Sequence, residues 1–341
     1  MNSRMDPRIN PRTNSRRANS RANPRTYSRR PRRVRRRYSR TGLIIIAVFF
    51  TAIGVGIFFM IANIITMAFN SNSPEVVEAG LFDNDYGDYP PEEEITEFAP
   101  GIPGVPMRVE DINDTGYLVL VNRQHAISPN SNLLVPLSPP EIPVRTIVGM
   151  YLHPTARQAV ADMFSSSRRA GFDGLFVTSG YRGYALQTEL YGDGDDAYVL
   201  PPGHSEHHTG LAADILVLDM GMGVEIMANS PEGHWLADNS YRYGLILRYP
   251  RGSEPITGVP FEPWHFRYVG RVHAYYMHRN NLVLEEYIQL IQDRGVINIR
   301  HGGITYYVAF QEVQDGMLHI PYGMNFAVSN DNSRGYIFTA W

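Results

Sequence analysis

The sequence predicts an α+β fold for the larger part of the chain. Short apolar, β-branched runs bounded by Gly, Pro and Asn are interspersed with stretches whose apolar residues recur at helical spacing. These runs do not follow the regular strand and helix alternation of a parallel sheet. The 341 residues include no Cys, which excludes disulfides and thiolate metal ligands. The fold must therefore hold by packing and hydrogen bonding.

The N-terminal arm, residues 1–41, is strongly basic. Fifteen Arg stand there against a single acid, Asp6, and apolar side chains are almost absent, which predicts disorder. The rest of the chain has 16 Arg, no Lys and 33 acids. A basic arm can contact anionic lipid headgroups or nucleic acid, but its charge is already explained as a determinant of membrane topology. We expect that role, with lipid contact as a by-product and no nucleic acid partner.

Residues 42–69 are predicted to form one transmembrane helix. They carry no charge, and at about 1.5 Å per residue they reach roughly 40 Å, enough to cross a hydrocarbon core of about 30 Å. A buried core helix rarely runs this long without a charge, and the apolar part of a cleaved signal peptide is shorter. The positive-inside rule places the arm in the cytoplasm and the remainder outside. We predict a single-pass protein of a bacterial cell membrane with its C-terminal part extracellular.

Residues 70–112 are predicted to be an extracellular linker. Between residues 70 and 106 the chain has nine acids, no bases and several Pro and Gly, a composition typical of stretched, solvated chain. At about 3.1 Å per residue, that stretch could hold a domain on the order of 100 Å from the membrane. Such a reach suits work inside a cell wall.

The folded domain is predicted to span residues 113–295. Strands are expected at 116–122, 175–178, 211–218, 245–249 and 256–259. Helices are expected at 155–169, 184–190, 230–243, 266–279 and 282–293, where apolar residues recur at helical spacing or a Ser-Pro pair starts the turn.

The last segment, 296–341, is predicted to be rich in β structure. Strand patterns at 304–310, 317–320 and 336–339 are separated by Gly and Asn turns. The segment could be a module that binds cell wall or a partner, or an extension packed on the preceding domain. Because so short a segment without Cys would be marginal alone, we favour packing.

Two segments of the domain offer ligands to a metal ion. The first, 205–214, contains His207 and Asp214, and the second, 262–265, ends in His265. Two imidazoles and a carboxylate are a common ligand set of catalytic zinc, which keeps a fourth position open. Asp214 stands in an apolar strand pattern, where a carboxylate without a partner or metal would be costly to bury. We expect these three residues to bind one zinc ion.

Two more charged residues have a chemical interpretation at such a site. Glu262, three residues before His265, can act as a general base toward a water at the open position. By itself it would be interpreted as a surface residue of a loop, but beside these ligands we favour the base. Arg182 follows a strand and a Gly180 turn, so its guanidinium can stabilise an oxyanion or bind a carboxylate. A surface salt bridge is the alternative for Arg182.

At these residues the sequence resembles a known family. The patterns are Ser-x-His-x-x-Gly-x-Ala-x-Asp at 205–214, Glu-Pro-Trp-His-Phe-Arg-Tyr-Val-Gly at 262–270, and Ser-Gly-Tyr-Arg at 179–182. They are similar to the motifs of the zinc D-alanyl-D-alanine carboxypeptidases of the VanY type. The similarity extends from about Tyr117 to Asp293, and three motifs in the same order make it specific.

The resemblance implies a small α+β domain with a central antiparallel sheet and flanking helices. It implies zinc as cofactor and removal of the terminal D-Ala from peptidoglycan stem peptides, a reaction that the predicted topology places outside the cell. The roles it implies are zinc ligands for His207, Asp214 and His265, catalytic base for Glu262, polarisation of the scissile carbonyl for Arg182, and substrate binding for Ser205 and Gln187.

Two other functions stay open on the sequence. A related zinc peptidase could cut an L,D bond or an internal bond of the stem peptide, because the ligands do not define the subsite that holds the terminal carboxylate. A wall-binding module could also keep the metal without the chemistry. The presence of Glu262 and Arg182 argues against that second reading, since binding alone needs no base beside a metal.

Overall fold

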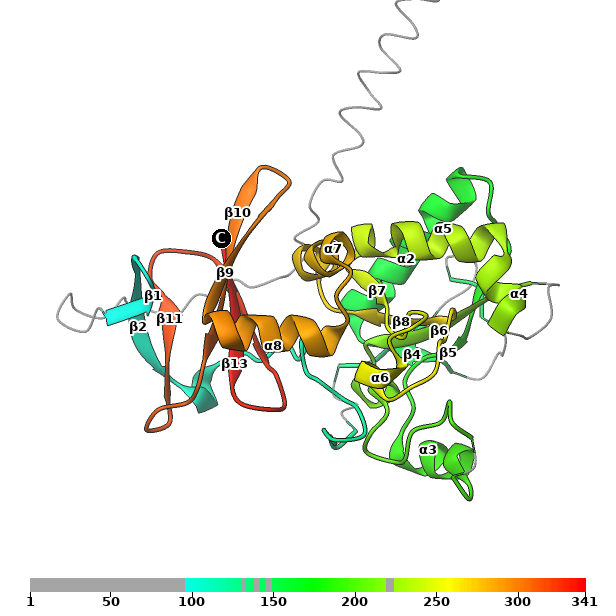
Figure 1. Ribbon diagram of the computed structural model, residues 1–341, viewed down its shortest axis with the longest axis horizontal. Coiled ribbons are helices and arrows are strands. Elements are labelled where there is room, and N and C mark those ends of the chain that lie inside the picture. Colours follow the sequence, from blue (N-terminus) through cyan, green and yellow to red (C-terminus); the bar gives the residue numbers. More distant parts are fainter. Residues whose placement is uncertain (1–95, 130–132, 138–141, 145–148, 195, 219–223) are drawn as a thin grey trace, which may run out of the picture. The chain divides into compact units, whose positions relative to one another are not determined.

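The computed structural model describes residues 96–341, apart from 130–132, 138–141, 145–148, 195 and 219–223 (Figure 1). The predicted arm (1–41), the predicted transmembrane helix (42–69) and most of the predicted linker lie outside these residues. Among the helices that are described, none has both the length and the apolar character needed to cross a bilayer.

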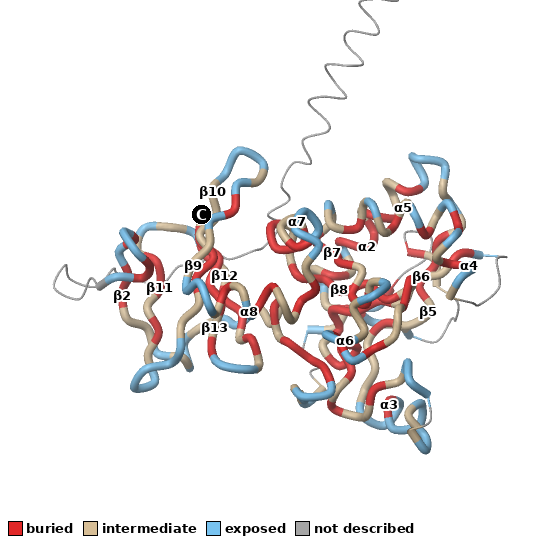
Figure 2. The backbone as a smooth tube through the Cα atoms, viewed as in Figure 1, coloured by how far each residue is buried: buried red, intermediate tan, exposed pale blue. Residues whose placement is uncertain are grey.

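The domain is built around a four-stranded antiparallel sheet. Its strands, in order across the sheet, are β5 (Leu175–Ser179), β6 (Ala212–Val217), β8 (His265–Tyr268) and β7 (Leu245–Leu247). Val177, Ile215 and Phe266 are fully buried on it, and Figure 2 shows the buried stretches of this sheet. Helices and an antiparallel sheet in one unit confirm the predicted α+β class.

Two predicted helices cover this sheet. α2 (Pro154–Arg169) packs Val160, Met163 and Phe164 into the same core as Leu236 of α5 (Pro231–Asn239). The N-terminus of α5 is capped as its sequence suggests, because Ser230 Oγ accepts a hydrogen bond of 2.8 Å from the Gly233 N–H. The 3-10 helix η4 (Ser240–Tyr243) follows and leads into β7.

The helix predicted at 266–279 is wrong over its first residues. The chain there forms β8, and α7 (Arg271–Asn280) begins only afterwards. Two causes separate them: β8 pairs with both β6 and β7, and Gly270 between them has φ 90°, which a helix does not tolerate. Phe266 lies three residues before Val269, and Tyr268 lies four before Val272, so these residues also fit helical spacing and the apolar pattern alone could not distinguish the two.

The strand predicted at 116–122 is also wrong. The segment lies in no ladder. Some of its backbone groups bond to side chains, as where Leu118 N–H donates to Ser329 Oγ at 2.9 Å and Val119 C=O accepts from Arg267 at 3.0 Å, and others bond to the backbone of turns and loops. The apolar pattern of the segment did correctly indicate that its side chains are buried, since Leu118 is 1 % exposed.

The strand predicted at 256–259 is a short helix, α6 (Glu254–Thr257). Pro255 lies in its first turn, where a missing N–H costs nothing, and Gly258 ends it in the left-handed conformation at φ 71°. The remaining α-helices of the described residues are α3 (Tyr184–Tyr191), α4 (Val224–Asn229) and α8 (Leu284–Arg294).

The linker predicted at 70–112 ends earlier than its composition suggested. β1 (Thr96–Ala99) and β2 (Ile102–Arg108) pair with each other, and β2 also pairs with β11 (Met317–Pro321) from the far end of the chain. Phe98 and Val105 are buried in one core with Phe338. This long-range pairing, which acidic composition does not report, orders the end of the predicted linker.

The C-terminal residues form a second four-stranded antiparallel sheet. Its order is β12 (Phe326–Asn330), β13 (Tyr336–Ala340), β10 (Ile304–Gln311) and β9 (Val296–His301), of which β9 and β12 were not predicted. Ile299, Val308 and Ile337 share a core with residues of α7 and α8. The segment 296–341 thus packs on the helices that follow the central sheet.

His273 connects α7 to this C-terminal sheet. It is buried, with Nδ1 2.7 Å from the Tyr287 hydroxyl of α8 and Nε2 3.0 Å from the Thr339 hydroxyl of β13. Burial lowers the pKa of His273 to about 3. The ring is therefore neutral in the folded protein at any pH well above 3.

This neutral ring predicts a loss of stability in acid. Between about pH 6.5 and pH 3 the unfolded chain binds a proton at His273 and the folded protein does not, so the free energy of unfolding falls as pH falls below about 6.5, by at most about 1.4 kcal/mol per pH unit. Urea unfolding of the full chain at pH 7 and pH 5 measures it. His273→Gln should show a smaller difference between the two pH values, and an equal difference would contradict this prediction.

Candidate metal centre and active site

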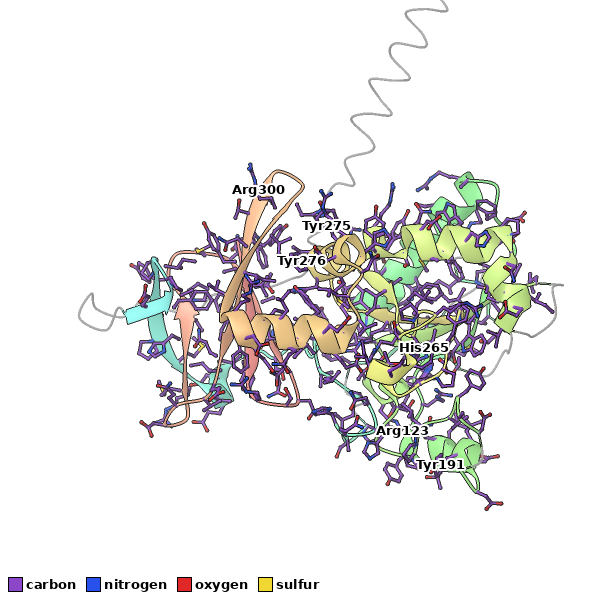
Figure 3. All side chains as sticks on the ribbon, viewed as in Figure 1. Arg123, Tyr191, His265, Tyr275, Tyr276 and Arg300 are labelled. Atoms are coloured by element: carbon purple, nitrogen blue, oxygen red, sulfur yellow. The ribbon has the colours of Figure 1, made fainter. Side chains whose placement is uncertain are left out.

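The pairing of β6 with β8 brings Asp214 and His265 together. The two residues are directly opposite in the antiparallel register, so their side chains leave the same face of the sheet. His265 Nδ1 lies 3.2 Å from Asp214 Oδ1. Figure 3 shows His265 among the packed side chains of the domain. The predicted ligands from the two distant segments therefore meet by strand register.

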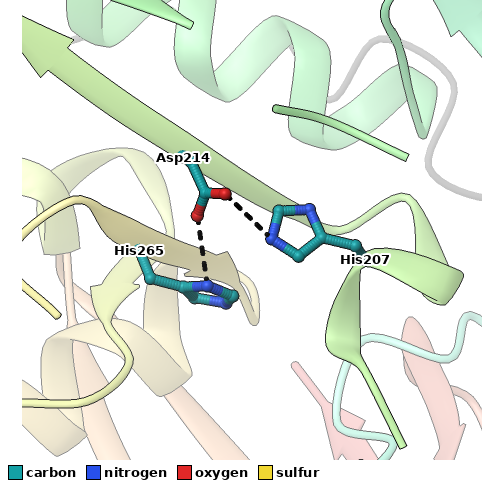
Figure 4. A group of neighbouring side chains, drawn as sticks. All are labelled: His207, Asp214 and His265. Atoms are coloured by element: carbon teal, nitrogen blue, oxygen red, sulfur yellow. Dashed lines mark ion pairs between the residues drawn. The ribbon is translucent and has the colours of Figure 1, made fainter. Parts of the chain in front are cut away.

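His207 reaches the same point from the 3-10 helix η3 (Glu206–Thr209), which immediately precedes β6. Its Nδ1 donates a hydrogen bond of 2.6 Å to the Gly180 carbonyl, which turns Nε2 toward Asp214 Oδ2, 3.3 Å away. Gly210 closes η3 at φ 71°, and a Cβ there would lie 2.7 Å from Leu134 Cδ2. Figure 4 shows both rings directed at the Asp214 carboxylate.

These three residues fit a metal ion. One ligand atom of each lies within 4.8 Å of the others. His207 Nε2 and Asp214 Oδ1 are buried, and apart from the 3.3 and 3.2 Å contacts within this group of three they have no polar partner among the described residues, which is unfavourable unless a cation binds between them. Burial, together with the nearby Arg182, lowers the pKa of His207 to about 4, so its ring is neutral and can offer a lone pair.

The two acids nearest the centre have opposite electrostatic environments. Burial alone would raise the pKa of Asp214, but His207 and His265 hold it well below its usual range, which keeps a ligand carboxylate ionised. Burial raises the pKa of Glu262, whose Oε2 lies 3.3 Å from His265 Nδ1. A raised pKa suits a group that must take up and release a proton near neutral pH.

A cavity of about 160 Å³ opens beside these groups. Arg182, Ser205 and Glu262 line it together with Asp214 and His265. The aromatic and aliphatic part of its wall comes from residues that the sequence did not indicate as a group: Tyr198, Val199, Leu200, Tyr249, Val259 and Trp264. The cavity thus joins polar groups and an apolar wall, as small-molecule sites commonly do.

The remaining predicted site residues occupy different positions. Ser205 Oγ lies 3.4 Å from Arg182 Nη2, so both face the cavity as a pair. Gln187 is fully buried, is not among the lining residues, and donates a hydrogen bond of 2.6 Å to the Leu200 carbonyl. The structure therefore places Gln187 behind the cavity wall, in contact with a residue that forms it.

Sequence reasoning missed a buried group of charges next to His265, which we name the Glu206 network: Glu206, which also lines the cavity, with Arg248, Arg267 and Glu285. Glu206 Oε1 accepts from Arg248 at 2.8 Å and from Arg267 at 2.9 Å, and Arg248 makes two hydrogen bonds to Glu285 of α8, at 2.8 and 2.6 Å. Both Arg stand among apolar residues of β8 and the end of β7, and that is the signal for buried charge that was used for Asp214 alone.

Comparison with known proteins bears on this arrangement. Residues 149–271 match the family model described as VanY, D-alanyl-D-alanine carboxypeptidase. A protein of Bacillus subtilis (strain 168) named "Putative carboxypeptidase YodJ" is 36% identical over 193 residues, which cover 53% of this chain and 70% of the relative. The chain belongs to the VanY family. The predicted resemblance is thereby confirmed, and the matched residues contain every predicted ligand.

Two further members of this comparison extend the match. The D-alanyl-D-alanine carboxypeptidase of Enterococcus faecium is 34% identical over 193 residues, covering 56% of this chain and 62% of the relative. The solved structure of the vancomycin resistance D,D-dipeptidase VanXYg in complex with a D-Ala-D-Ala phosphinate analog aligns with a TM-score of 0.60 and 28% identity, over 70% of this chain and 98% of that one. The VanY-like fold therefore covers most of the described residues.

Proposed function

We propose that this chain is a zinc D,D-carboxypeptidase that removes the terminal D-Ala from peptidoglycan stem peptides. One observation carries the proposal: His207, Asp214 and His265 converge within 4.8 Å at a cavity that also presents Glu262 and Arg182, in a member of the VanY family. Relatives in this family are named D-alanyl-D-alanine carboxypeptidases. A binding module would have no use for a buried base and a guanidinium at the same cavity.

The ligand set supports zinc. Two ring nitrogens and one carboxylate oxygen match a common catalytic zinc site, and a bound zinc ion supplies Lewis acidity that makes water a stronger nucleophile at neutral pH. His207 would bind through Nε2, because its Nδ1 is committed to Gly180. His265 would bind through Nδ1, the nitrogen that faces Asp214 and Glu262.

The other cavity residues then divide the work of hydrolysis. Glu262 Oε2 takes a proton from the attacking water and later returns it to the amine nitrogen of the departing D-Ala. The Arg182 guanidinium, whose Nε is buried without a hydrogen-bond partner among the described residues, stabilises negative charge on the carbonyl oxygen. Ser205 holds Arg182 from the side, and the apolar wall excludes water from the leaving group.

We also propose that the site works outside the cell, on a membrane anchor. The uncharged run 42–69 with fifteen Arg before it supports an N-terminus in the cytoplasm, and the acidic residues after it support an extended tether. Protease added to intact cells should remove the domain and leave the arm protected. An arm that is digested equally would reject this topology.

Mass spectrometry of defined muropeptides tests the activity. Incubation of the zinc-loaded full chain with a pentapeptide stem should remove one D-Ala and leave the tetrapeptide. An internal cut would support an endopeptidase instead, loss of D-Ala only from a tetrapeptide stem would support an L,D-peptidase, and no change in either would support a wall-binding module. Free D-Ala-D-Ala belongs in the same experiment, because the D,D-dipeptidase VanXYg shares the fold.

A further inference from the structure

Both ring nitrogens of His265 contact carboxylates, and one of these carboxylates belongs to Glu206, which also lines the cavity. His265 Nε2 lies 3.3 Å from Glu206 Oε2, while Nδ1 lies 3.2 Å from Asp214 and 3.3 Å from Glu262. Glu206 is 1 % exposed and immediately precedes His207, so one turn of chain supplies both a predicted ligand and a contact to another. The ring of His265 is thus held between two sets of carboxylates.

The two oxygens of Glu206 have separate partners. Oε1 accepts from Arg248 at 2.8 Å and from Arg267 at 2.9 Å, which leaves Oε2 for His265. Both guanidiniums are fully buried, and Arg267 is fixed further by the carbonyls of Tyr117 and Val119. A carboxylate that accepts hydrogen bonds from two guanidinium groups is ionised, and an ionised carboxylate can only accept hydrogen bonds.

The charges of the Glu206 network cancel. Its two carboxylates and two guanidiniums sum to zero, which is how four charged groups can be buried together. The bidentate pair between Arg248 and Glu285 anchors the network on α8. Glu206 therefore presents a fixed negative charge to His265. Its position is held by hydrogen bonds to Arg267 of β8 and, through Arg248, to Glu285 of α8.

We propose that Glu206 is a positioning residue for the metal centre: its Oε2 accepts the Nε2 proton of His265 and so directs the Nδ1 lone pair of that ring toward the metal. The inference rests on the proposed zinc function and adds to it a residue that is not one of the three converging ligands and acts through His265. Carboxylates behind ligand imidazoles fix both the tautomer and the orientation of the ring, and their loss typically weakens metal binding about 10- to 100-fold.

Zinc affinity of the full chain, measured by competition with a chromophoric chelator, tests the proposal. Glu206→Gln should bind zinc about 10- to 100-fold more weakly than the wild type. The matched control is Glu285→Gln, which removes the same charge from the same network but does not contact His265, and it should bind zinc within about threefold of the wild type. Equal affinity losses in the two variants, or none in Glu206→Gln, would overturn the proposal.

A spectroscopic measurement on the unaltered chain covers the case in which Glu206→Gln does not fold. Long-range proton–nitrogen spectra of the zinc-loaded chain, labelled at His, should show the Nε2–H tautomer for His265, with His265→Gln assigning the signal. The Nδ1–H tautomer would overturn the proposal. If the wild type binds no zinc at all, the proposed function fails, whereas normal zinc binding with an unaffected Glu206→Gln variant rejects the positioning role alone.

Discussion

Glu262→Gln is expected to lower kcat on a pentapeptide stem by about 10²- to 10⁴-fold while zinc stays bound. The amide keeps the size of the side chain but cannot take a proton from water, and Glu262 is not one of the three residues that converge as ligands. Burial raises the pKa of the Glu262 carboxyl, which suits it to accept a proton from water, and the amide of the variant cannot accept that proton. The measurement is D-Ala release in parallel with zinc content by elemental analysis.

A carboxylate elsewhere on the domain controls for this change. Glu225, in α4, is exposed and pairs with Arg251 at 2.9 Å, far from any role in the cavity that the structure shows. Glu225→Gln should turn over at the wild-type rate. Turnover of Glu262→Gln within a few-fold of that control would reject Glu262 as the base.

His207→Ala is expected to remove bound zinc and turnover together, from about one ion per chain to near none. The ring is fully buried, and His207 is one of the three residues that converge as ligands, so its removal leaves only Asp214 and His265 of that group. Elemental analysis after dialysis against metal-free buffer gives the zinc content, and D-Ala release gives the turnover.

The neighbouring His208 provides a matched control for this loss. It is equally buried, but its Nδ1 donates to the Arg182 carbonyl and its Nε2 accepts from Gly203 N–H, so neither nitrogen is free for a metal. His208→Ala should keep its zinc. Loss of zinc from both variants would indicate general unfolding, and full zinc in His207→Ala would contradict the ligand set.

The sequence identified the residues of the candidate site more completely than the boundaries of the helices and strands around it. His207, Asp214 and His265 were recognisable because ligand chemistry restricts residue type and spacing at once. The boundary between β8 and α7 was not, because Phe266 and Tyr268 alternate as in a strand and also lie at helical spacing from the apolar residues that follow. Pairing with the strands on either side of β8 decided between the two. The misread segment 116–122 likewise depends on Ser329 and Arg267, which no local pattern reports.

The Glu206 network shows the same limit at the site itself. The apolar neighbours of Arg248 and Arg267 indicate buried charge but not its partners, and only the approach of α8 to the central sheet makes Arg248 and Glu285 a pair. Gln187 shows the opposite difference, since the sequence indicated it as a site residue and the structure places it outside the cavity lining. Its match to a family position suggested contact with substrate, whereas the structure gives it a hydrogen bond to the Leu200 backbone and burial behind the cavity wall.

The pairing of β2 with β11 has a mechanical consequence. The chain enters the described unit through β1 and β2, and β2 is held by β11 along the register from Gly104 with Pro321 to Arg108 with Met317. A pull on the preceding residues would load these hydrogen bonds in the three-stranded sheet β1-β2-β11, which shares no strand with the central sheet. Tension on the chain would therefore be borne by β2 and β11 before it reached β6 and β8, the strands that carry Asp214 and His265.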